Sequence, residues 1–213
     1  MSKQSDPYIL LAEKHGFGKS QSYLRVLRFL MTPEQADIVT MLPGSPEDVA
    51  QKSGSDLAKV RRNLDILHRK GVIVYTDYKT PGSYMFCKYA ERLWEVSESL
   101  LGLDIYTEEE TKRLFSLWED WKKTDYADMT AERWLNLKAM GINGLRIVPA
   151  YKAILDSPQI LPQEEPREIV RVQPLITGVP CSCRKHAQLI GRPCRKSQAA
   201  ADCRQFAKPA ADR

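Results

Sequence analysis

Residues 64–75, LDILHRKGVIVY, contain the end of a helix, a glycine turn and the start of a strand. Four apolar residues in and before this stretch recur at the spacing of one helical face: Leu57, Val60, Leu64 and Leu67. Ser55 or Asp56 is expected to cap this helix, and Gly71 follows its last turn, where helices favour glycine. The β-branched and aromatic run at residues 72–75 then predicts a strand.

Capping signals and a turn extend this pattern in both directions. Residues 20–30 place apolar side chains on one helical face, and Thr32 and Ser45, each followed by proline, begin two further helices. After the strand, residues 80–83 (TPGS) predict a turn, and residues 84–87 (YMFC) predict the returning strand of a hairpin. The first hundred residues are therefore expected to form helices followed by one β-hairpin.

The order of these elements resembles a winged helix-turn-helix, the fold of many prokaryotic regulators. The resemblance covers about residues 20–100, and residues 64–75 are its most specific part. It implies that the helix before Gly71 corresponds to the recognition helix and the hairpin to the wing.

The middle of the chain has a helical pattern rich in tryptophan. Thr107 to Glu110 form a capping-box sequence, and four apolar residues after it share one helical face: Leu114, Leu117, Trp118 and Trp121. Residues 130–140 predict another helix that ends before Gly141. We expect the tryptophans to pack in the core rather than to stack on a cofactor, because Trp118 and Trp121 lie on an apolar stripe.

The C-terminal third differs in composition from the rest. Seven of the thirteen prolines lie between Pro149 and Pro193, and short strands are expected at residues 145–148 and 175–179. Such a segment cannot build a large core alone, so it needs a partner domain or a covalent or metal staple. The predicted class is mainly α with a small β part (α+β). It comprises a winged helix-turn-helix domain at residues 1–101, a helical connector at 102–144 and a metal-stapled domain at 145–213.

Four of the five cysteines are close together in this last domain: Cys181, Cys183, Cys194 and Cys203. In a reducing compartment such a group is typical of a metal site rather than of disulfides, and four thiolates can hold a cubane iron–sulfur cluster or a zinc ion. In an extended Cys-x-Cys the two side chains lie roughly 6.5–7 Å apart. That spacing suits two irons better than one zinc, whose ligand sulfurs are about 3.8 Å apart. The sequence favours the cluster, with zinc and a metal-free basic tail as alternatives.

Basic side chains surround these cysteines and would offset the negative charge of four thiolates. We expect four residues to lie just outside the ligands: Arg184, Lys185, His186 and Arg195. His186 is also the residue that could replace a cysteine ligand, as histidine does at some clusters. Cys87, alone in the hairpin, is expected to be a buried structural cysteine.

The C-terminal third also resembles a family of iron–sulfur proteins of anaerobes, known mainly as predicted 4Fe-4S ferredoxin-type proteins. The matching pieces are RIVP at residues 146–149, ILP at 160–162, REIV at 167–170 and GVPCSCR at 178–184. The resemblance implies an N-terminal winged-helix-like region and a 4Fe-4S cluster on Cys181, Cys183, Cys194 and Cys203. Many members continue into CxxCxxCxxxCP repeats, whereas this sequence offers ligands for one cluster.

Charge and hydropathy narrow the class of function. The net charge of +5 and a pI of about 8.9 permit contact with nucleic acid or an acidic partner without requiring either. The sequence has no apolar stretch long enough for a bilayer and no signal-peptide pattern at its start, so we expect a cytoplasmic protein without membrane contact. No arrangement for nucleophilic catalysis stands out, so an electron-transfer or accessory redox role is favoured over an enzyme.

Two functions follow from these features, with a zinc-stapled structural adaptor as the third. One is a redox protein that docks on a partner protein, and the other is a redox-responsive DNA-binding regulator. Four basic residues are candidates for DNA or partner contact: Lys59, Arg61, Arg62 and Lys79. Asp56 and Asp65 on the same helix weaken the DNA interpretation, so the redox protein is favoured. A homo-oligomer is compatible with either function.

Overall fold

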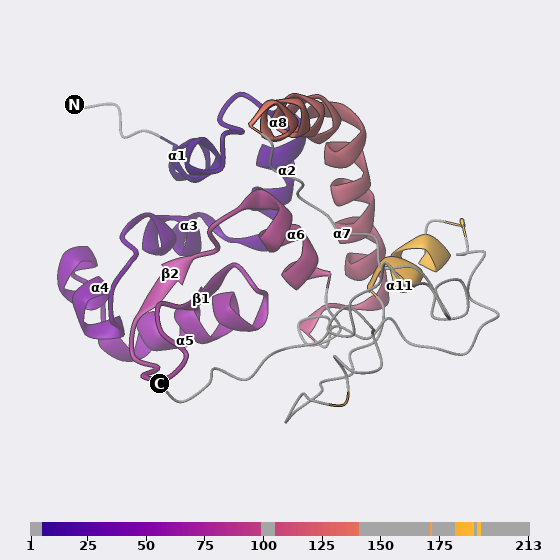
Figure 1. Cartoon of the computed structure of the whole chain (residues 1–213). Coiled ribbons are helices and arrows are strands. Elements are labelled where there is room, and N and C mark those ends of the chain that lie inside the picture. The colour runs from indigo at the N-terminus through magenta and orange to yellow at the C-terminus, as the bar shows by residue number, and fades with distance from the viewer. Residues whose placement is uncertain (1–5, 99–104, 141–170, 172–181, 190, 193–213) are drawn as a thin grey trace. The chain divides into compact units, whose positions relative to one another are not determined.

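The computed structural model describes residues 6–98, 105–140, 171, 182–189 and 191–192 of the chain. The chain divides into two units, residues 1–128 with 182–198 and residues 129–181 with 199–213. The described residues are mainly helical with one small sheet, as the sequence predicted (Figure 1). The strands that the sequence predicts at residues 145–148 and 175–179 lie outside the described residues.

The first unit begins with five helices, a hairpin and a sixth helix. The helices are α1 (Pro7–Lys14), α2 (Gln21–Leu30), α3 (Pro33–Thr40), α4 (Pro46–Ser53) and α5 (Leu57–Arg69). The strands β1 (Ile73–Tyr75) and β2 (Tyr84–Phe86) follow, and then α6 (Ala90–Ser97). Three of these helices begin as predicted: Thr32 and Ser45 each form a full capping box, and the Asp56 side chain caps α5. Helix α1 was not predicted, although Asp6 followed by Pro7 carries a similar signal.

The hairpin is a short antiparallel sheet in which Ile73 pairs with Phe86 and Tyr75 pairs with Tyr84. Gly71 connects it to α5 with a φ of 73°, the left-handed conformation that glycine adopts most easily. A Cβ atom at Gly71 would lie 2.4 Å from Cγ1 of Val96 on α6. Glycine is therefore required at the base of the hairpin both by its backbone and by the close approach of α6.

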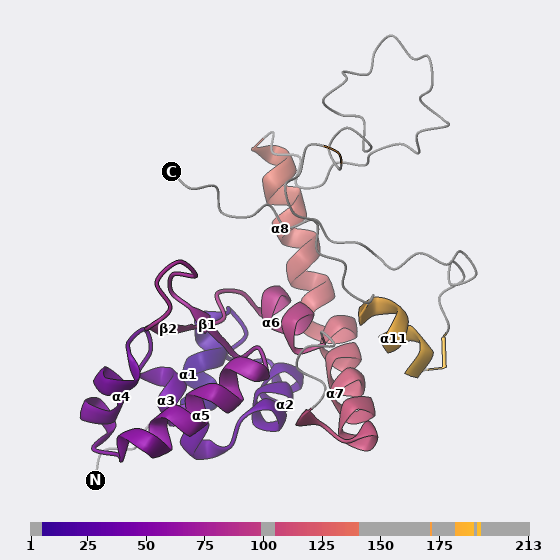
Figure 2. The ribbon, with the colours of Figure 1, turned by 90° about the horizontal axis from the view of Figure 1, so that it is seen from below.

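The tryptophans of the core lie where α2 packs against α7 (Glu108–Trp121) (Figure 2). Trp118 and Trp121 are fully buried, as expected for core residues, and both rings contact Tyr23 of α2. Leu114 is buried with them, whereas Leu117 is half-buried and Phe115, which the helical stripe did not include, is fully buried. The apolar face of α7 is therefore centred closer to Phe115 than the sequence pattern indicated.

The helical run does not stop after Trp121. A π-helical segment at Lys122–Tyr126 leads directly into α8 (Ala127–Ala139), so the break expected before residue 130 is absent. Neither glycine nor proline occurs between Glu108 and Ala139, and the backbone can accommodate the change of period as a single π turn. The helix predicted at residues 130–140 is thus present as α8, and it begins three residues earlier than the sequence indicated.

Candidate functional site

The cysteine motif leads into a short helix, α11 (Ser182–Leu189). Cys183 is its second residue, so its backbone is helical and the expectation of an extended Cys-x-Cys was wrong. The sequence SCRKHAQL has no β-branched residue, glycine or proline that would oppose a helix. The distance between cysteine side chains along a strand therefore no longer favours an iron–sulfur cluster over a zinc ion at this motif.

Most of the predicted metal site lies outside the described residues. This applies to Cys181, Cys194, Cys203 and Arg195, and to the side chains of Cys183, Arg184 and Lys185. Their roles as ligands or as neighbours of a metal remain predictions. His186 is the one predicted site residue in this region whose side chain the structure describes.

His186 connects α11 to two other helices of the first unit. Its Nδ1 lies 2.7 Å from Oε1 of Glu98, at the end of α6, and its Nε2 lies 3.2 Å from Oε2 of Glu119 on α7. The ring is 5% exposed and packs against Phe115, with ring centroids 5.0 Å apart. Each ring nitrogen therefore faces a carboxyl oxygen within hydrogen-bond distance. In this arrangement neither nitrogen of His186 is free to bind a metal.

Glu119 is the carboxylate on which these contacts depend. Nζ of Lys122 lies 3.2 Å from its Oε2, and Nζ of Lys123 lies 3.3 Å from its Oε1. Burial acts to raise the pKa of the Glu119 carboxyl, but hydrogen bonds and charge from the two lysines outweigh it and lower the pKa to about 2. Arg192, just after α11, lies 3.9 Å from Oε1. Glu119 thus remains a carboxylate at neutral pH and contacts α11 at His186 and the chain beyond it at Arg192.

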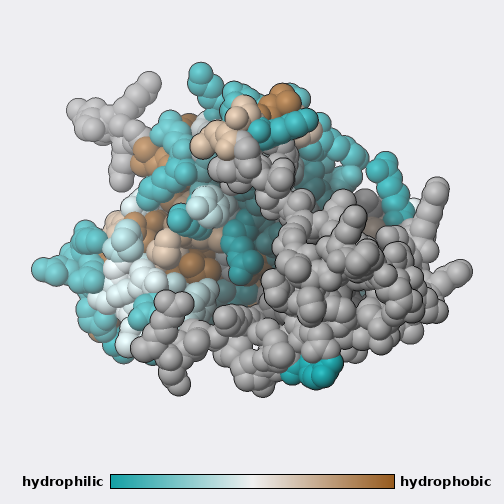
Figure 3. Space-filling model, in the orientation of Figure 1, coloured by the Kyte–Doolittle hydropathy of each residue, from teal (hydrophilic) through white to brown (hydrophobic). Residues whose placement is uncertain are grey.

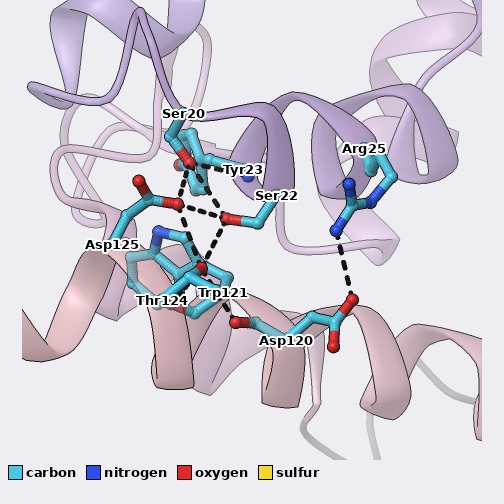
Figure 4. Close-up of polar contacts among 8 residues, drawn as sticks. All are labelled: Ser20, Ser22, Tyr23, Arg25, Asp120, Trp121, Thr124 and Asp125. Carbon is cyan, nitrogen blue, oxygen red and sulfur yellow. Dashed lines mark hydrogen bonds and ion pairs between the residues drawn. The ribbon is translucent and has the colours of Figure 1, made fainter.

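A polar cluster in turn attaches the end of α7 to the start of α2 (Figure 4). Oδ2 of Asp125, in the π-helical segment, accepts hydrogen bonds from the hydroxyls of Ser22 at 2.6 Å, Ser20 at 2.7 Å and Thr124 at 3.1 Å. These bonds, with that from Ser22 the largest, lower the pKa of the Asp125 carboxyl. The Ser20 hydroxyl also accepts from the amide of Tyr23, so the cap of α2 belongs to the same cluster.

The helix that carries Cys183 therefore rests on a continuous series of contacts. Helix α2 contacts α7 through buried aromatic rings, and it contacts the π-helical segment after α7 through Asp125. Helix α7 contacts α11 through Glu119. The sequence did not reveal Glu98, Glu119 or Asp125 as partners in these contacts. Each is separated from its partner by between 67 and 105 residues, and no local pattern marks such pairs.

Two of the four residues predicted for DNA or partner contact form ion pairs within the protein. Lys59 lies 2.6 Å from Glu34 of α3, and Arg61 lies 2.6 Å from Glu47 of α4. Arg62 is exposed, and Lys79 is exposed in the turn between the strands. The two carboxylates reduce the positive charge that α5 presents, although exposed pairs of this kind add little stability.

Cys87 is 1% exposed and free, as predicted for a structural cysteine. Burial raises the pKa of its thiol, which favours the unreactive protonated form. His68, near the end of α5, packs against the ring of Tyr75 with centroids 4.6 Å apart. These two side chains have packing roles in the described structure.

We expect replacement of His186 with alanine to loosen α11. The change leaves the buried Glu98 carboxyl without this partner, which costs about 1–3 kcal/mol. Trypsin cuts after basic residues, so its rate of cleavage after Arg184 and Lys185, followed by mass spectrometry, reports on this helix. Gln188→Ala, at an exposed position of α11, is the matched control and should leave the rates unchanged. Equal cleavage of the His186→Ala and wild-type proteins would contradict the role of His186.

Among the described residues, no group of three or more His, Cys, Asp or Glu side chains is arranged to hold a metal ion. Within the same residues, no helix has the length and apolar character needed to cross a membrane. No protein-family model, curated protein or solved structure matches the chain.

Proposed function

We propose that the protein binds one 4Fe-4S cluster through Cys181, Cys183, Cys194 and Cys203 and serves in redox or electron transfer. The observation that carries the proposal is the place of Cys183 in the first turn of α11, a helix whose His186 contacts Glu98 at the end of α6 and Glu119 on α7. A binding residue is positioned best when it lies on such a supported element. The first turn of a helix also favours negative charge, and the thiolate is the form of cysteine that binds metals.

The chemistry of the donor set fits the proposed group. Four thiols suffice for one cubane cluster, and the same four could hold zinc, which is the alternative occupant. Three cations of the described chain lie around Glu119, beside α11: Lys122, Lys123 and Arg192. The sequence predicts that Arg184, Lys185 and Arg195 add to this positive charge, and positive charge near a cluster raises its reduction potential. When bound, the cluster would supply a one-electron carrier.

We further propose that the first unit is a winged helix used to dock on a redox partner protein. Helix α4, the turn at Gly54 and α5 have the order of a helix-turn-helix, and β1 and β2 would form the wing. The pairing of Lys59 and Arg61 with carboxylates favours a protein partner over DNA, because DNA binding gains much of its affinity from unpaired cations that contact phosphates.

Anaerobic purification followed by metal analysis tests the proposed cofactor. We expect a brown protein with about four irons and four acid-labile sulfides per chain, the content of one cubane cluster. Colourless anaerobic protein with one zinc per chain would contradict the cluster and indicate a structural zinc instead.

Selection from a random DNA pool at about 150 mM salt tests the docking proposal. An enriched sequence bound with nanomolar affinity would contradict docking on a protein partner and indicate DNA regulation instead.

A further inference from the structure

A cavity of about 320 Å³ opens on the first unit where the end of α1, the loop after α3 and the hairpin meet. Its volume is at the lower end of the range of about 300–1,000 Å³ that is typical of small-molecule sites. Figure 3 shows hydrophobic residues gathered between α1 and the hairpin, with hydrophilic side chains around them. None of the residues that line the cavity is part of the proposed cluster site.

The floor of the cavity is apolar. Leu42, Pro43 and Phe86 contribute to it, and the ring of His15 stacks on that of Phe86 at 4.4 Å between centroids, with 7° between the planes. His15 is held from two sides, since its Nε2 lies 2.6 Å from the Cys87 carbonyl oxygen and its Nδ1 lies 2.5 Å from the Tyr23 hydroxyl. A ligand would therefore meet a preformed surface rather than one that must rearrange.

The hydrogen bonds also determine the state of the His15 ring. Burial lowers the pKa of His15, so the neutral ring is favoured. A carbonyl oxygen only accepts, so Nε2 carries the proton and donates to Cys87, while Nδ1 accepts from Tyr23. Both nitrogens are thus used within the protein, and His15 offers a ligand its flat ring rather than a charge.

The charge at the cavity comes from two lysines. Lys14 at the end of α1 and Lys88 after β2 both line it, and both are exposed. Neither forms an ion pair with a carboxylate of the described chain, in contrast to Lys59, Lys112, Lys122 and Lys123. Lys88 lies over the ring of Tyr89. The negative charge of Glu91 acts to raise the pKa of His15, but Glu91 is not among the residues that line the cavity. The site therefore combines an apolar floor with two cations that have no carboxylate partner in the described chain.

We propose that this cavity binds a small organic acid, with its apolar body on Leu42, Pro43 and Phe86 and its carboxylate paired with Lys14 and Lys88. A few polar groups at the edge of an apolar cavity are the usual means of orienting a small ligand. None of the four proposed cluster ligands lines the cavity, so the site can be present whether or not the protein binds a cluster.

Octanoate is a suitable probe, with octanol as its neutral analogue and octylamine as its cationic one. Calorimetric titration of the full chain should show binding of octanoate, at least about tenfold weaker binding of octanol, and no binding of octylamine. Lys14→Gln and Lys88→Gln should each weaken octanoate binding by about two- to fivefold, the effect of one exposed ion pair, and together by about tenfold. Lys19→Gln removes the same charge from an exposed residue that does not line the cavity, so it is the matched control and should have no effect.

Amide NMR shifts locate the ligand without relying on the variants. Octanoate should shift the backbone amides of Thr76, Met85 and Lys88 and leave those of α7 unchanged. The proposal is overturned by an absence of shifts up to about 10 mM, where even a millimolar site would be filled. The proposal is also overturned if octanol binds as tightly as octanoate, or if the Lys14 and Lys88 double variant binds octanoate as tightly as the wild type does.

Discussion

Replacement of Trp118 with alanine is expected to lower the free energy of unfolding of the first unit by about 3–5 kcal/mol. Trp118 is fully buried, and its ring lies 5.2 Å from that of Trp121 between centroids. Its Nε1 donates a hydrogen bond of 2.9 Å to the Ser97 hydroxyl. Alanine would leave a large cavity between α2 and α7 and would leave Ser97, at the end of α6, without this donor.

Urea unfolding monitored by far-UV circular dichroism measures this change without relying on tryptophan fluorescence. Trp118→Phe should cost less than Trp118→Ala, because it keeps much of the apolar volume and loses mainly the bond to Ser97. Tyr78→Ala, at a residue that is 72% exposed, should change stability by no more than about 0.5 kcal/mol. A Trp118→Ala protein with wild-type stability would contradict the packing of α7 on α2.

The second large effect concerns the cysteines. Replacement of Cys181, Cys183, Cys194 or Cys203 with alanine should each remove most of the bound iron, because a cubane cluster needs four ligands. Cys87→Ala is the matched control, since Cys87 is a buried cysteine in the hairpin, and it should retain its iron. Iron and sulfide are measured on anaerobically purified variants, with the visible spectrum as a second readout.

Different outcomes would revise the ligand set in different ways. Full iron content in Cys194→Ala would remove that residue from the set. His186 is then a poor substitute, because both its nitrogens already face Glu98 and Glu119. Loss of iron in Cys87→Ala with normal folding would instead show that the hairpin contributes a ligand.

Local signals predicted the N-terminal elements well. The capping sequence at Thr32 and the glycine at residue 71 act over a few neighbouring residues, so their effect can be read directly from the chain. The burial of Val60, Leu64 and Leu67 follows from their helical spacing in the same way. Leu57, at the first turn of α5, is only half-buried, because spacing gives the direction of a face but not how far the neighbouring elements extend over it.

The contacts around α11 could not be predicted by these means. The distance between His186 and Glu98 in the sequence is 88 residues, and their contact depends on how α6, α7 and α11 come together. In the sequence, His186 is notable only because it lies near cysteines. That position suggested a metal ligand rather than a side chain packed between two carboxylates. The extended form expected for Cys183 had a similar origin, since spacing alone does not decide between strand and helix in a motif of three residues.

The close approach of Val96 to Gly71 has a consequence for how this protein can vary during evolution. At the base of the hairpin, a Cβ on residue 71 would lie within 2.4 Å of a side chain from α6, so a substitution there disturbs two elements at once. At the tip, Gly82 has no atom within 4 Å of the position where a Cβ would be. Changes in length and composition are therefore tolerated at the tip between the strands, where a peptide tag can also be inserted, while the base is constrained to remain as it is.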